Sequence, residues 1–136
     1  MDKLVIESKL ESLLELLDKL KRVLEEHKQN TKLQEFLLYA AEKKAEEAVE
    51  LAISINQELL KEKSKVSLSY YDSFVDLSVF KVFSPSELKE LASTAGFRNR
   101  LAHEYLEVNP EIAMRAMQRM LEIYPKYLQG VRKIIK

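Results

Sequence analysis

The stretch DKLVIESKLESLLELLDKLKRVLEE, residues 2–26, decides the fold of this chain. Its apolar side chains recur at alternating intervals of four and three residues, at Ile6, Leu10, Leu13, Leu17, Leu20 and Leu24. This spacing puts them on one face of an α-helix. Because the pattern lasts for only about three heptads, it indicates a helix of a bundle rather than a long coiled coil.

A second long helix is predicted from about residue 31 to about residue 62. Thr31, with Gln34 three residues later, has the spacing of a capping box, and the polar stretch before it interrupts the first pattern. At 1.5 Å per residue the helix would be about 45 Å long. Its inner face is predicted to consist mainly of small residues, which let a neighbouring helix approach closely: Ala41, Ala45, Ala48, Ala52, Ile55 and Leu59.

Two shorter helices are predicted next. Residues 68–83 are rich in aromatic and poor in β-branched side chains, which favours a short helix through Phe74, Leu77 and Phe80 over a strand. The sequence Ser84-Pro85-Ser86-Glu87 is a strong helix start, with serine as N-cap, proline at the first helical position and glutamate as the capping partner. The inner residues of this helix are predicted to include Leu88, Leu91 and Ala95.

The pair Asn109-Pro110 repeats this start signal for a last helix, in which Pro125 is expected to introduce a kink. Its predicted inner residues are Ile112, Ala116, Met120, Ile123, Tyr127, Val131 and Ile134. Together the patterns predict an all-α fold of about five helices, with residues 1–136 forming a single domain.

Composition excludes several classes of protein. The chain has 136 residues, 46% of them hydrophobic and 32% charged, which is the balance of a globular protein. The absence of cysteine excludes disulfides, and with only two histidines a structural zinc site has no credible ligand set, so no metal is expected. No stretch approaches the roughly 18–20 apolar residues of a membrane span, and charges interrupt the N-terminus, so we expect no membrane segment and a cytoplasmic location.

Charge does not by itself indicate a partner, because the formal net charge is zero. Its distribution is uneven, however, since Glu122 is the only acid among the basic residues of the C-terminal stretch: Arg115, Arg119, Lys126, Arg132, Lys133 and Lys136. Both a surface for an anionic partner and a solvated helix face fit this pattern.

The stretch GFRNRLAHEY, residues 96–105, is the densest group of functional side chains. Arg98 offers fixed donors for phosphate oxygens, and His103 can move protons near neutral pH. Asn99 could bond a ribose or orient the imidazole, and Tyr105 could stack on a base or present a hydroxyl. These are the parts of a metal-independent ribonuclease, in which a ribose 2′-hydroxyl attacks the adjacent phosphate.

Helix geometry restricts this interpretation. Arg98 and His103 are five residues apart, which is about 140° around the axis of a straight helix. They would converge on one phosphate only if the helix is disrupted near Gly96 or if two chains each contribute part of the site. Spacing alone favours an ordinary charged surface, with Arg98 and Arg100 pairing with Glu104 or Glu107.

The run from Arg98 to Tyr105 resembles the Arg-x4-His-x-Tyr motif of HepT-like toxins, a branch of the HEPN superfamily. The preceding Ala95-Gly96-Phe97, the alanine-rich helix and the final Asn109-Pro110 helix also resemble the family's layout. The chain departs from the family at two places: relatives often carry an Ile-Asp pair where this sequence has Glu50-Leu51, and many are apolar where it has Arg100.

The resemblance implies an up-and-down helical bundle that forms a homodimer, with Arg98 and His103 of both protomers lining a shared cleft. It implies a metal-independent endoribonuclease without a cofactor, acting on RNA as the toxin of a toxin–antitoxin pair, with Asn99, Arg100 and Tyr105 supporting the site or binding RNA. The implied partner is a minimal nucleotidyltransferase antitoxin, which in some systems transfers AMP onto the motif tyrosine, here Tyr105. Two alternatives stay open: a non-catalytic binding partner of a nucleotidyltransferase, and a purely structural helical bundle.

Overall fold

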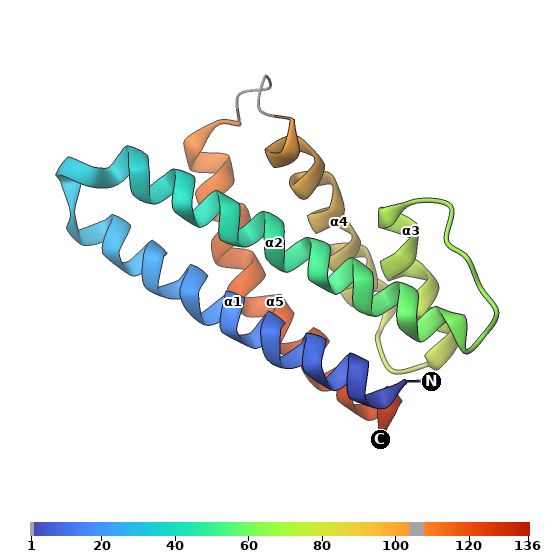
Figure 1. The fold of residues 1–136 in the computed structure, drawn as a ribbon. Helices are drawn as coiled ribbons and strands as arrows, with labels where there is room; N and C mark the ends of the chain where they lie inside the picture. The colour runs from blue at the N-terminus through green and yellow to red at the C-terminus, as the bar shows by residue number, and fades with distance from the viewer. Residues whose placement is uncertain (1, 104–107) are drawn as a thin grey trace.

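The computed structural model describes residues 2–103 and 108–136, which form five α-helices and two short 3₁₀ helices and contain no strand (Figure 1). In chain order the elements are α1 (Lys3–Gln29), η1 (Thr31–Leu33), α2 (Gln34–Lys61), α3 (Tyr70–Val75), η2 (Asp76–Phe80), α4 (Pro85–Ala102) and α5 (Pro110–Ile135). The predicted all-α fold of about five helices is therefore confirmed.

The four long helices run alternately up and down, as expected for the predicted bundle (Figure 1). α1 and α2 form an antiparallel pair, and α5 returns along α1, so that the start of α1 lies beside the end of α5. The short α3 packs against α2 and α4 at one end of the bundle. None of the helices in the described ranges is long and apolar enough to cross a membrane.

The six apolar residues predicted for the inner face of α1 are all buried, and so are the six predicted for α2. The predicted capping box at Thr31 and Gln34 is wrong, because Thr31 lies inside η1. Asn30 caps that segment instead, its Oδ1 accepting from the Leu33 N–H at 3.2 Å. The Gln34 amide nitrogen donates to the carbonyl of His27 at 3.2 Å, which ties the turn to the end of α1.

The helix start at Ser84 is confirmed as a capping box. The Glu87 N–H donates to Ser84 Oγ at 3.1 Å, and the Ser84 N–H donates to Glu87 Oε1 at 2.8 Å. Hydrogen bonding from the Ser84 backbone N–H, and then from the Ser84 side chain, holds the pKa of the Glu87 carboxyl below its usual value. The last helix likewise begins as predicted, with Asn109 as N-cap.

The inner face of α5 differs from the prediction at Ile112, Ala116 and Ile134, of which the last two are half-buried. Ile112 is 52% exposed, and the adjacent Ala113 is buried instead. From there the buried seam has the same alternating spacing as α1, through Ala113, Met117, Met120, Tyr124, Tyr127 and Val131. α5 continues through Pro125 to Ile135 without interruption, and its path changes direction near the middle (Figure 1).

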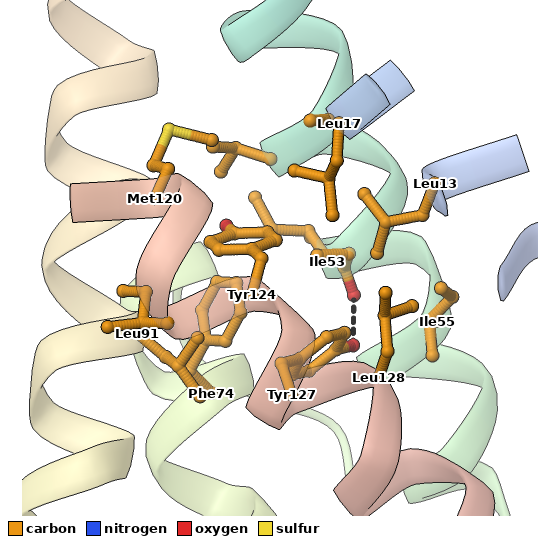
Figure 2. Packing of buried hydrophobic residues seen from close by; sticks show 14 of the residues in the cluster. Leu13, Leu17, Ile53, Ile55, Phe74, Leu91, Met120, Tyr124, Tyr127 and Leu128 are labelled. Carbon is orange, nitrogen blue, oxygen red and sulfur yellow. Dashed lines mark hydrogen bonds between the residues drawn. The ribbon is translucent and has the colours of Figure 1, made fainter. Parts of the chain in front are cut away.

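Two tyrosines of α5 bring hydroxyl groups into the core (Figure 2). The Tyr127 hydroxyl lies 2.5 Å from Asn56 Oδ1 and 3.0 Å from the carbonyl oxygen of Ala52, two acceptors on α2 that share its one proton. The Tyr124 hydroxyl lies 2.7 Å from Thr94 Oγ1 on α4. Burial raises the pKa of both tyrosines, so both remain protonated donors.

Close approach of α5 to Phe83 requires a glycine. A Cβ built on Gly130 would lie 2.2 Å from Phe83 Cε1, much closer than atoms can pack. The Phe83 ring in turn stacks on Tyr127, with ring centroids 6.1 Å apart. Gly130 therefore allows the segment before α4 to pack directly on α5.

Candidate active site

α4 carries the described part of the motif and is not disrupted at Gly96, so the first of the two explanations for a converging Arg98 and His103 is wrong. The helix ends at Ala102, and His103 is its C-cap, with φ −90° and ψ 85°. The His103 N–H donates to the Asn99 carbonyl at 3.3 Å. His103 therefore stands where the backbone leaves the helix, five residues beyond Arg98.

The guanidinium of Arg98 is held by three neighbours. Its Nη2 and Nε donate to Oε1 of Glu50 on α2, at 2.7 Å and 3.1 Å. Its Nη1 donates to Asn99 Oδ1 at 3.2 Å. Its Cζ lies over the ring of Tyr70, at the start of α3, 5.7 Å from the ring centroid. Three elements of the bundle therefore determine the orientation of this one side chain.

This group is open to solvent on one side, because the side chains of Arg98 and Glu50 are 23% and 45% exposed. The acid that pairs with Arg98 lies 48 residues earlier in the sequence, whereas the sequence interpretation had placed its partners at Glu104 or Glu107, outside the described residues. A guanidinium that presents several donors in one plane is suited to a phosphate group, which would compete with the Glu50 carboxylate for them.

The predicted site residues come together only in part. Asn99 accepts from Arg98 through its side chain and from the His103 backbone N–H through its carbonyl. Arg100 is exposed on the last turn of α4. Tyr105 lies outside the described residues. Among residues 2–103 and 108–136, no group of three or more His, Asp or Glu side chains is arranged to hold a metal ion.

Glu50 and Tyr70 belong to the site but were not predicted as site residues from the sequence. Glu50 was named only as a departure from the family pattern, yet it supplies a carboxylate from α2 to the motif arginine. The position of an acid near the usual Ile-Asp pair was the signal for it. Tyr70 gave no signal beyond belonging to an aromatic stretch, because its contact with Arg98 depends on how α3 packs.

Hydrogen bonds from the core fix the position of Tyr70. Its carbonyl accepts from Ser73 Oγ at 2.7 Å, and Ser73 Oγ accepts from the amide of Asn56 at 3.3 Å. Asn56 is the residue bound by the Tyr127 hydroxyl. Ser69 caps α3, accepting from the Asp72 N–H at 3.0 Å. A continuous chain of polar contacts thus connects α5 to the backbone under Tyr70.

An all-α bundle in which an arginine of α4 pairs with a glutamate of α2, and in which a histidine caps the end of α4, fits the class of protein that the motif suggested. A family model described as Ribonuclease HepT-like matches residues 13–132. The chain belongs to this HepT-like family.

Relatives and solved structures agree with this membership. The chain is 29% identical over 137 residues to the tRNA nuclease HepT of Aphanizomenon flos-aquae (strain 2012/KM1/D3), with 96% of this chain and 90% of that protein covered. Its fold is similar to that of a tri-AMPylated Shewanella oneidensis HEPN toxin solved in complex with an MNT antitoxin, with a TM-score of 0.77, 20% identity and coverage of 98% and 99% of the two chains.

A second solved structure, a toxin–antitoxin with AMP-PNP, gives a TM-score of 0.76 at 20% identity, covering 95% of this chain and 98% of the other. At these identities the likeness to the solved structures establishes the fold, which is the HEPN-type bundle expected from the sequence.

Proposed function

We propose that this chain is a metal-independent endoribonuclease, the toxin of a toxin–antitoxin pair, and that it cleaves RNA with Arg98 and His103. The observation that carries the proposal is the place of these two motif residues at the end of α4, in a chain of the HepT-like family. The relative from Aphanizomenon flos-aquae is named a tRNA nuclease, so tRNA is the first substrate to test.

In the proposed reaction a ribose 2′-oxygen attacks the adjacent phosphorus while the bond from phosphorus to the 5′-oxygen breaks. His103 moves the proton between these oxygens, and Arg98 stabilises the negative charge that develops on the phosphoryl oxygens. The strand is left with a 2′,3′-cyclic phosphate on one product and a 5′-hydroxyl on the other. No cofactor takes part.

The site is proposed to be shared by two copies of the chain, each forming a single domain over residues 1–136. The support is geometric: α4 is continuous through Gly96, so no break of the helix at that point brings Arg98 and His103 together. A second copy that contributes its own α4 end would complete the site, with Asn99, Arg100 and Tyr105 beside the substrate.

The test is cleavage of tRNA by the purified protein in EDTA, compared with His103→Ala. Because general acid–base catalysis contributes about 10²- to 10⁴-fold, we expect His103→Ala to lose at least about a hundredfold in rate. His103 is exposed, so the melting temperature should stay unchanged. Equal cleavage by the two proteins would exclude His103 as the catalytic base.

We further propose that a minimal nucleotidyltransferase antitoxin binds this chain and transfers AMP from ATP onto the Tyr105 hydroxyl, which loses its proton as pyrophosphate leaves. The support is that similar folds were solved as toxin–antitoxin complexes, one with an AMPylated toxin. Intact-mass measurement after co-expression with such an enzyme should show added AMP groups, and Tyr105→Phe should abolish the addition at that position. An unchanged mass in the wild-type protein would contradict this part of the proposal.

One observation favours a second candidate, a non-catalytic partner of the nucleotidyltransferase. Arg98 already donates from all three of its nitrogens to protein acceptors, as a purely structural arginine would. The cleavage assay separates the two functions, because only the ribonuclease loses RNA cleavage in His103→Ala.

A further inference from the structure

Tyr70 is an aromatic side chain in contact with Arg98, whose charge the proposed ribonuclease would use on phosphate. One side of its ring is covered by the Arg98 guanidinium, and the residue remains 45% exposed. The free part of the ring is not needed for the core, which is built from other aromatics of the bundle, such as Phe74 and Tyr127.

A half-exposed ring beside a phosphate-binding cation is the arrangement by which proteins hold unpaired nucleotides. Bases stack on aromatic side chains while basic side chains contact the backbone of the strand. A base is joined to its phosphate by a single ribose, so the stacking surface must lie within one nucleotide of the phosphate site. The 5.7 Å from the Arg98 Cζ to the Tyr70 ring centroid meets this requirement.

The backbone that carries this ring is also held in place, and the Arg98 guanidinium lies over the ring. Tyr70 is the first residue of α3, its carbonyl is fixed by Ser73, and Ser73 is fixed through Asn56 by the core. A stacking surface that is already ordered loses little entropy when a base binds.

We propose that Tyr70 is a base-stacking residue of this site, holding an unpaired nucleobase next to the phosphate bound by Arg98. The substrate is therefore RNA that is single-stranded, or unstacked, at the cleaved position. This inference rests on the proposed ribonuclease function, since it assigns the nucleotide that the same site accepts.

Tyr71 provides a matched control. It is the neighbouring residue on α3 and is similarly exposed, at 42%. It lies instead in a groove with Val75, Pro85 and Lys89, and among the described residues the ring over which Arg98 lies is that of Tyr70. Loss of an exposed tyrosine from α3 can therefore be compared at two positions with different neighbours.

The experiment measures binding of a 5′-labelled single-stranded RNA by fluorescence anisotropy in the His103→Ala background, where the RNA stays intact. Because stacking contributes about 1–3 kcal/mol per base, Tyr70→Leu should weaken binding about tenfold. Tyr70→Phe keeps the ring and should bind as the parent does, and so should Tyr71→Leu. A fully paired RNA of the same sequence should show no loss with Tyr70→Leu.

A second measurement separates stacking from a merely structural effect on Arg98. The same oligonucleotide is prepared with one abasic nucleotide at each position in turn. If Tyr70 stacks on a base, one abasic position should weaken binding to the parent protein and abolish the difference between parent and Tyr70→Leu. If Tyr70 only supports Arg98, Tyr70→Leu will weaken binding equally for every oligonucleotide, and the inference is overturned.

Different results would overturn the ribonuclease function and the stacking role of Tyr70. Cleavage of RNA by the wild-type protein, with equal RNA affinity for the parent and Tyr70→Leu, would overturn the stacking role and leave the ribonuclease intact. Absence of both cleavage and binding would overturn the ribonuclease function, and the stacking role with it.

Discussion

Tyr124 and Tyr127 are fully buried tyrosines on one helix. Their hydroxyl groups are expected to contribute different amounts to the free energy of unfolding. Tyr124 meets Thr94, whose own hydroxyl already donates to the Leu91 carbonyl at 2.6 Å. Tyr127 is the partner of the Asn56 side-chain oxygen, which is completely buried. Removing a partner from a buried polar atom costs more than removing a bond whose other atom keeps a second partner.

Substituting each tyrosine by phenylalanine should reveal this difference. Tyr127→Phe leaves the Asn56 oxygen without its donor and should lower the free energy of unfolding by about 1–3 kcal/mol. Tyr124→Phe should lower it by about 1 kcal/mol or less. Urea unfolding followed by circular dichroism measures both, and the prediction fails if Tyr124→Phe is the more destabilising change.

For single residues, the sequence predicted which side chains are buried better than it predicted their hydrogen-bond partners. Periodicity placed Tyr127 on the inner face of the last helix, because burial follows the angular position of a residue. It could not predict that its hydroxyl would meet Asn56, since that contact depends on how two helices are placed in the bundle. Glu50 and Arg98 escaped prediction as a pair for the same reason.

Among the elements, α4 and α5 each contain one glycine, and the two have opposite surroundings. Gly96 on α4 is exposed, and a Cβ there would meet no atom within 4 Å. Gly130 on α5 faces the ring of Phe83, which is itself stacked on Tyr127 and has little freedom to move. An added methyl group therefore fits at Gly96 and collides with the Phe83 ring at Gly130.

Alanine at these two positions should change stability in opposite directions. Gly96→Ala should stabilise by up to about 1 kcal/mol, because alanine is the better helix former. Gly130→Ala should destabilise by about 1–2 kcal/mol, because overpacking costs more than the helix propensity returns. The measurement is the urea unfolding free energy of the two variants, and a stabilised Gly130→Ala would contradict the role assigned to Phe83.

The α5 register shows where element prediction failed. Ile112 was expected to be buried because it is large and apolar, and Ala113 is buried instead. The helix begins at Pro110, so its first turn lies at the rim of the bundle, where angular position rather than hydrophobicity decides which residue faces inward. The start signals of α4 and α5 were predicted correctly, because a capping serine or asparagine followed by proline acts locally.

For the whole molecule, a site shared by two chains predicts that two inactive variants restore activity when their subunits are mixed. A mixture of Arg98→Ala and His103→Ala proteins, each inactive alone, should regain cleavage after subunit exchange. If Arg98 of one chain works with His103 of the other, the recovered rate should approach about a quarter of the wild-type rate, because half the dimers are mixed and each contains one intact site.

The control is the same mixture before exchange, together with light scattering to establish the oligomeric state. No recovery in a mixture that light scattering shows to be dimeric would mean that both residues act from one chain. A monomer at micromolar concentration would remove the shared cleft altogether.

The fold as a whole was predictable because its signals are local and repeated. The candidate site was predictable only where it is local, at Arg98, Asn99 and His103 on one helix and its cap. Its other two members come from α2 and α3, 48 and 28 residues away from Arg98, and only packing brings them together.

The chain of contacts from Tyr127 to Tyr70 also has a consequence for synthesis of the protein. The ribosome releases Arg98 and His103 before it releases α5, so a nascent or prematurely terminated chain carries the motif but not the tyrosine that anchors Asn56 and, through Ser73, the α3 backbone. A truncated product therefore lacks the support for the site that the full-length chain has. For the proposed ribonuclease, this order of synthesis means that the fully supported site forms only after α5 has been made.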